Sequence, residues 1–132
     1  MAISLHKTSP HGFDETIERI TGLLQTEGFG ILTTIDLQAK FKEKLDRDSD
    51  RYVILGACNP ALAWDAVGAV PELGVLLPCN VIVREQGAVH VDVMDPNAAL
   101  SLVEDETVAA VAAEARTRSN RVRASAATAS KR

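Results

Sequence analysis

A β-hairpin in the second half of the chain places the strongest constraint on the fold. Two valine-rich segments, residues 73–84 and 88–94, flank the turn sequence Glu85-Gln86-Gly87. Turn residues between two such segments are typical of a hairpin. We therefore predict two antiparallel strands joined by a tight turn.

The valines indicate the register of this hairpin. A three-residue loop pairs Val81 with Val93 and Val83 with Val91, and it puts Val89 on the same face. A two-residue loop would shift the pairing by one position and set the valines against an aspartate and a histidine. Because a one-residue shift moves every side chain to the other face of the sheet, we predict the first register.

The other elements follow from apolar spacing and from capping residues. Strands are predicted over residues 2–7, 29–35 and 52–58. Helices are predicted over residues 13–27, 37–45 and 59–68, and a last helix from residue 105 to residue 118 or beyond. Gly28 is placed to end the first helix, and Asp36 to cap the second. In the strand over residues 29–35, the two-residue period puts Ile31 and Thr33 on one face. The order of elements predicts an α+β fold, a mainly antiparallel sheet with helices packed on one face.

Length and composition limit the class of protein. The 132 residues are 46% hydrophobic and 24% charged, which excludes a collagen, a wholly disordered chain and a disulfide scaffold. No apolar run approaches the roughly 18 residues of a membrane helix, and residues 1–15 lack the features of a secretory signal. We therefore expect a soluble, cytoplasmic protein with no membrane partner. Residues 1–118 are expected to form a single α+β domain, and residues 119–132 a basic Ser/Ala/Arg-rich tail that is flexible or a frayed helix end.

The charge is divided unevenly along the chain. Residues 1–115 carry 8 basic and 18 acidic side chains, a net charge of −10, whereas residues 116–132 carry 6 basic and no acidic ones, a net charge of +6. An acidic body is a poor surface for nucleic acid, because phosphates need clusters of Lys and Arg. The basic tail leaves contact with nucleic acid or another anionic surface open, but we favour a solvated tail.

Two sequence blocks resemble a known family. They are Leu55-Gly56-Ala57-Cys58-Asn59-Pro60-Ala61-Leu62-Ala63 and Gly74-Val75-Leu76-Leu77-Pro78-Cys79-Asn80-Val81-Ile82-Val83, preceded by Phe13-Asp14-Glu15-Thr16 and Glu27-Gly28-Phe29-Gly30-Ile31-Leu32-Thr33. Over residues 3–118 the chain resembles the bacterial and archaeal family called domain of unknown function 302. The resemblance implies a TATA-binding-protein-like β-α-β(4)-α arrangement and a homodimer. It implies no established activity, and a link of relatives to sulfur metabolism is by analogy only. A likeness to a DNA-binding fold does not by itself imply DNA binding.

Cys58 is the first candidate for chemistry. It precedes Asn59, the expected N-cap of a helix that begins at Pro60. Free backbone N–H groups and the positive end of the helix favour the thiolate, which is the nucleophilic and metal-binding form. Inert packing is the alternative, because free cysteine is among the most buried residue types.

Cys79 is the second candidate. In the predicted register it shares the core-facing side with Val81, so inert packing is an alternative here too. If the strands that carry Cys58 and Cys79 are antiparallel neighbours, the end of one lies beside the start of the other. We then expect one pocket that contains both thiols, with the asparagines as flanking amides and the prolines as lining: Cys58, Asn59, Pro60, Pro78, Cys79 and Asn80.

Such a pocket predicts a binding or carrier module for a small sulfur species, a metal ion or an anion, with no further cofactor. One alternative is a thiol-dependent enzyme with Cys58 as the nucleophile, for which no catalytic motif or general base is recognisable. The other is a structural or protein-interaction dimer with inert cysteines, in which the outer face of the sheet, with Ile82 and Met94, forms the contact.

The histidines and the tryptophan are expected to play no part in the pocket. A structural zinc site needs about four ligands, and two cysteines leave two to be found. His90 points to the face opposite Cys79 in the predicted register, and His6 and His11 are expected at the surface. Trp64 is expected to pack against the rest of the domain.

Overall fold

The computed structural model describes residues 2–127, which form a five-stranded sheet and its helices. The strand order is β1-β5-β4-β3-β2, and every neighbouring pair is antiparallel. The strands are β1 (Ser4–Ser9), β2 (Gly30–Asp36), β3 (Tyr52–Cys58), β4 (Cys79–Gln86) and β5 (Ala88–Met94). The helices are α1 (Phe13–Thr26), α2 (Leu37–Leu45), α3 (Pro60–Ala69), α4 (Pro96–Leu100) and α5 (Glu106–Ser125), with a 3₁₀ helix η1 (Pro71–Leu76). The predicted α+β class is confirmed.

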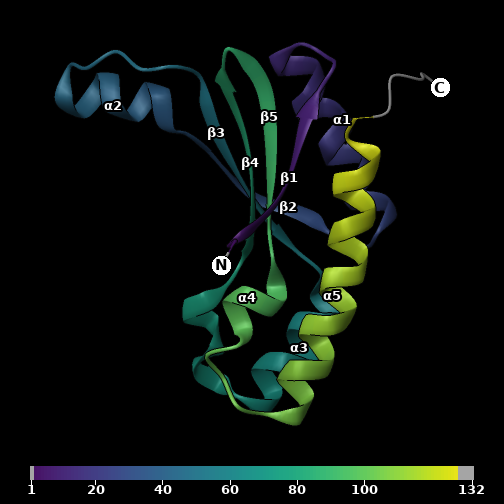
Figure 1. Cartoon of the computed structure of the whole chain (residues 1–132). Coiled ribbons are helices and arrows are strands. Elements are labelled where there is room, and N and C mark those ends of the chain that lie inside the picture. Colours follow the sequence, from purple (N-terminus) through teal and green to yellow (C-terminus); the bar gives the residue numbers. More distant parts are fainter. Residues whose placement is uncertain (1, 128–132) are drawn as a thin grey trace.

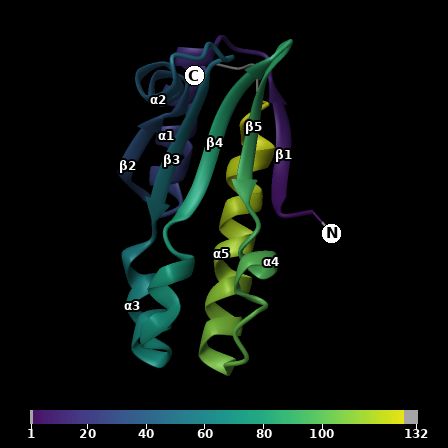
Figure 2. The ribbon, with the colours of Figure 1, turned by 90° about the vertical axis from the view of Figure 1, so that its left-hand side faces the viewer.

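Helices α1 and α5 cover one face of the sheet, whereas α2 projects away on the other side (Figure 1). Helices α3 and α4 lie with the first half of α5 at one end of the sheet (Figure 2). The core lies between the sheet and the covering helices, where alternate strand residues are buried: Val53, Leu55, Ala57, Val81, Val83, Val91 and Val93. No helix within residues 2–127 combines the length and the apolar character that crossing a membrane requires.

The predicted register of the hairpin is confirmed. Val81 lies opposite Val93 and Val83 opposite Val91, and the chain turns at Gly87, whose φ is +73°. The first strand of the hairpin is shorter than predicted. Residues 71–76 form η1 instead, because Pro71 occupies a first-turn position that favours a helix. Strand β4 therefore begins only at Cys79.

The predicted alternation in β2 is wrong. Ile31 pairs with Ala57 and Thr33 with Gly56, so Leu32 is an extra residue without a partner in β3. This bulge puts Ile31 and Thr33 on opposite faces, because their partners are consecutive residues of β3. Leu32 is left 65% exposed.

Both predicted helix boundaries around β2 are confirmed. Gly28 has a φ of +84° after α1, and the N–H of Phe29 donates to the carbonyl of Leu24 (2.9 Å), as in a glycine-terminated helix. The Asp36 side chain accepts from the N–H of Ala39 (3.0 Å) at the start of α2.

Helix α5 extends beyond residue 118, as the open end of the predicted helix allows. It runs to Ser125, and Val122 and Ala126 belong to the main core. Two arginines of the expected tail region make ion pairs or hydrogen bonds within the chain, since Arg121 pairs with Glu27 (2.9 Å) and Arg123 donates to Asn120 (2.6 Å). Residues 119–125 therefore belong to α5, with Ala126 as its C-cap, and the helix is packed on the core through Val122 and Ala126. The rest of the expected tail, residues 128–132, lies outside the described residues.

Candidate functional site

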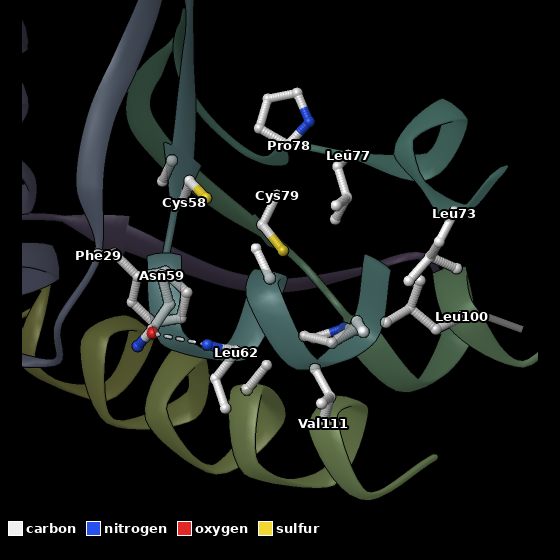
Figure 3. Close-up of a pocket in the computed structure, with 15 residues that line it drawn as sticks. Phe29, Cys58, Asn59, Leu62, Leu73, Leu77, Pro78, Cys79, Leu100 and Val111 are labelled. Atoms are coloured by element: carbon white, nitrogen blue, oxygen red, sulfur yellow. Dashed lines mark hydrogen bonds between the residues drawn. The ribbon is translucent and has the colours of Figure 1, made fainter. Parts of the chain in front are cut away.

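The two cysteines line one cavity at the end of the sheet where α3 begins (Figure 3). The cavity is small, with a volume of about 30 Å³. Apolar side chains, the two thiols and one amide form its wall: Phe29, Ala57, Cys58, Asn59, Leu62, Ala63, Ala66, Leu73, Leu77, Pro78, Cys79, Pro96, Leu100, Val111 and Ala115. No charged side chain of the described residues belongs to this wall.

The strand register brings the two thiols together. Cys79 lies opposite Ala57, so Cys58 is one position away along the neighbouring strand. Strand spacing and rise put the two Cα atoms about 6 Å apart. Strand β3 ends at Cys58 and the chain turns into α3, so both sulfur atoms face the same cavity (Figure 3).

The two thiols differ in their electrostatic surroundings. Burial raises the pKa of the Cys79 thiol from its ordinary value of 9.0 to about 11, with a further contribution from the negative charge that Cys58 can carry. Cys79 therefore keeps its proton at neutral pH. Cys58 stands one residue before the N-cap of α3. As whole residues, both cysteines are intermediate in exposure.

Asn59 joins the cavity to the rest of the fold. Its side-chain oxygen accepts from the N–H of Leu62 (3.2 Å) and caps α3. Its amide nitrogen donates to the carbonyl of Glu27 (3.4 Å), to which Arg118 also donates (2.9 Å). The start of α3 is thus held against the end of α1 and the middle of α5.

Four of the six predicted site residues line the cavity, namely Cys58, Asn59, Pro78 and Cys79. The other two do not. Pro60 forms the exposed first turn of α3. Asn80 pairs with Gly56, so the two-residue period turns it to the outer face of the sheet, away from both thiols. The prediction that Pro60 and Asn80 belong to the pocket is therefore wrong.

The apolar wall of the cavity was not predicted. Leu73 of η1, Leu100 of α4 and Val111 of α5 come from distant parts of the chain. These residues reach the cavity only because η1, α4 and α5 pack together at the end of the sheet. The spacing of apolar residues along the sequence does not indicate this packing. Trp64, expected to pack, is 81% exposed on the side of α3 that faces away from the cavity.

The outer face of the sheet carries a second, shallower hollow. It is a groove of about 300 Å³, lined by Ile3, Ser4, Asn80, Ile82, Asp92, Met94, Ala98 and Ala99. Asp92 in its floor is 9% exposed and accepts from the guanidinium of Arg84 (2.8 Å). Helix α2, on the same side of the sheet (Figure 1), has no buried residue.

The fold and this site define a class: an α+β domain built on an antiparallel sheet, with a dithiol cavity at one end. The chain belongs to the family described as "Domain of unknown function DUF302", which matches residues 5–126. It is similar to the solved structure described as "Crystal structure of uncharacterized conserved protein DUF302 from Bacillus stearothermophilus", with 28% identity, a TM-score of 0.85, and coverage of 92% of this chain and 96% of the other. A search of curated proteins gives no match. The family resemblance is confirmed, and no specific function is established by it.

Proposed function

We propose that this chain is a carrier module that holds one sulfur atom as a persulfide on Cys58, beside the protonated thiol of Cys79. The observation that carries the proposal is the presence of both thiols in the wall of one small apolar cavity. The proposal places this chemistry in the cytoplasm, where thiols are kept reduced.

The size and polarity of the cavity favour sulfur over the other ligands expected for such a pocket. About 30 Å³ holds one small species, whereas organic ligands occupy pockets of roughly 300–1,000 Å³. An anion would meet no cationic side chain among the described lining residues. A metal ion would find only the two sulfurs as strong ligands in the described wall, whereas a structural zinc site needs about four.

Loading is a simple exchange between sulfur atoms. The Cys58 thiolate attacks the terminal sulfur of a donor persulfide or polysulfide, a new S–S bond forms, and the donor's S–S bond breaks. A persulfide donor leaves as a thiolate, and an inorganic polysulfide leaves as the anion shortened by one sulfur atom. No oxidant is needed, because the sulfur transferred is already at the persulfide level.

The protonated state of Cys79 allows the persulfide on Cys58 to persist in this scheme. A Cys79 thiolate would attack the inner sulfur of the persulfide on Cys58, form a disulfide between the two residues and release sulfide. The geometry permits this reaction, because the Cα separation of about 6 Å lies within the range of disulfides. Since the pKa of Cys79 is raised to about 11, its thiolate is scarce at neutral pH and the persulfide persists. The described wall offers Cys58 no general base, which favours a carrier over a thiol-dependent enzyme.

Intact-protein mass spectrometry tests the proposal. Reduced protein is exposed to inorganic polysulfide, desalted and weighed, alongside Cys58→Ser and Cys79→Ser. We expect the native chain to gain one sulfur atom and Cys58→Ser to gain none. Cys79→Ser should load equally well, since it retains the thiol that is attacked. Equal loading of native protein and Cys58→Ser, or no loading at all, would contradict the proposal.

A specific observation favours a second function, self-association through the outer face. On α2, Phe41 is 37% and Leu45 58% exposed, and no residue of this helix is buried in its own chain. The groove on the same side of the sheet is lined largely by apolar side chains, including Ile82 and Met94. We propose that a second copy of the chain covers this face, with α2 of one copy packed on the sheet of the other.

Phe41→Asp tests this self-association cleanly, because Phe41 is not part of the core. Molar mass is measured by light scattering during gel filtration. We expect a dimer for the native chain and a folded monomer for Phe41→Asp. Ala39→Asp, an exposed residue on the opposite side of α2, serves as the control and should remain dimeric. A monomeric native chain would rule the interface out.

A further inference from the structure

Two histidines that are far apart in the sequence meet on the outer face of the sheet. His6 of β1 lies opposite Asp92, and His90 of β5 lies opposite Thr8, so the histidines are diagonal neighbours. Nε2 of His6 and Nδ1 of His90 are 3.0 Å apart, and the ring centroids are 5.2 Å apart. Both side chains reach solvent, and neither takes part in the dithiol cavity.

A backbone carbonyl fixes the tautomer of His90. Nε2 of His90 lies 3.2 Å from the carbonyl oxygen of Gln86. Since a carbonyl only accepts, this nitrogen carries the proton, and in the neutral ring the lone pair is left on Nδ1, directed at His6. Histidines that bind metal ions commonly donate their second N–H to a backbone carbonyl in this way, which orients the ring.

The charges beside the pair are already balanced. The guanidinium of Arg84, which lies opposite His90, pairs with Asp92 (2.8 Å) and donates to the side chain of Gln86 (2.9 Å). The cation nearest to the pair is thereby held by a carboxylate, so it offers less repulsion to an incoming metal ion.

We propose that His6 and His90 bind one divalent transition-metal ion through Nε2 and Nδ1. The ion replaces the hydrogen bond between the two nitrogens: His6 moves its own proton to Nδ1, and both exposed rings turn so that their lone pairs converge on the ion. With metal–nitrogen bonds of about 2.0–2.1 Å, nitrogens 3.0 Å apart subtend about 95° at the metal. An angle near 90° suits neighbouring positions of the tetragonal geometry of Ni²⁺ and Cu²⁺ better than tetrahedral Zn²⁺.

The pair supplies two ligands, and water supplies the rest. Among residues 2–127 no group of three or more His, Cys, Asp and Glu side chains is placed to hold a metal ion. The site is therefore open, with exchangeable positions, and we expect rapid exchange in place of the permanent hold of a structural metal.

Calorimetric titration with Ni²⁺ tests the proposal on the full chain without an affinity tag. Ni²⁺ is the probe because Cu²⁺ would oxidise the thiols. The chain has three histidines, so His6→Gln and His90→Gln are the test variants and His11→Gln is the matched control. We expect one Ni²⁺ per chain, a loss of affinity of about 10–100-fold or more in each test variant, and no change in His11→Gln.

Two results would overturn the site. One is the absence of saturable Ni²⁺ binding by the native chain. The other is an unchanged affinity in His6→Gln and His90→Gln, which would assign the bound ion elsewhere, for example to the thiols if Cys58→Ser abolishes it. Circular dichroism of each variant verifies that it is folded, which is expected because both rings lie outside the core.

Discussion

Cys58 and Cys79 lie on neighbouring antiparallel strands, one position out of register, and line the same cavity. Ordinary alternation would turn them to opposite faces of the sheet. They face one cavity because β3 ends at Cys58, where the backbone leaves the sheet for α3. The two thiols therefore share one cavity, but they differ in their electrostatic surroundings.

The buried thiol should make stability fall at high pH. The pKa of Cys79 is about 11 in the folded protein and 9.0 ordinarily. Between these pH values the unfolded chain has lost a proton that the folded chain still holds, so stability decreases as the pH rises. The loss is absent below about pH 8 and approaches at most roughly 2–3 kcal/mol above pH 11.

Urea unfolding of native protein and Cys79→Ala at pH 8 and pH 10.5 measures this effect. Other groups also titrate in this range, so the difference between the two proteins isolates the thiol. Cys79→Ala should lose less stability than native protein between these pH values. Cys58→Ala should keep most of the native loss, because burial is the larger cause of the raised pKa of Cys79 and the charge of Cys58 the smaller one. Parallel losses in native protein and Cys79→Ala would show that burial of Cys79 is not responsible.

Asn59 should contribute to stability through both ends of its amide. We expect Asn59→Ala to cost about 1–2 kcal/mol of unfolding free energy, because α3 loses its cap and the Glu27 carbonyl loses a donor. Asn59→Asp keeps the acceptor for the N–H of Leu62 and loses only the donor, so it should cost less. Denaturant midpoints of the three proteins provide the comparison, and an equal cost for both variants would argue against the cap.

Gly56 should tolerate no side chain. A methyl group there would collide with the Thr33 side chain and lie 3.0 Å from Pro78. We expect Gly56→Ala to reduce the unfolding free energy by about 1–3 kcal/mol, as overpacking does. Thr33→Ala in the same chain should recover part of the loss. Gly74→Ala is the control, since nothing lies within 4 Å of the added carbon. Equal unfolding temperatures for Gly56→Ala and Gly74→Ala would contradict this account.

The parts of the fold that were predictable depend on local patterns. The pairing of Val81 with Val93 follows from alternation on both sides of a turn, and the end of α1 at Gly28 follows from the need for a positive φ. Cys79 on the core side of β4 follows from the same register. These features need only residues that are close in sequence.

The features that the sequence did not predict depend on contacts between distant segments or on a break in the two-residue alternation of a strand. The bulge at Leu32 adds one residue to β2, and no property of Leu32 itself signals it. The contact of His6 with His90 needs the pairing of β1 with β5 across the whole chain. Asn80 was assigned to the pocket because it follows Cys79 in sequence, although alternation turns it to the other face.

Alkylation of the folded protein as a function of pH, read at each cysteine by mass spectrometry, tests the central claim most directly. The account predicts that Cys58 is modified at a lower pH than Cys79, which stays protected until the pH approaches 11 or the fold is lost. The ordinary pKa of this thiol is 9.0, so Cys79 should be clearly separated from a free thiol. If neither cysteine reacts before unfolding, both are core packing, and the carrier function is contradicted.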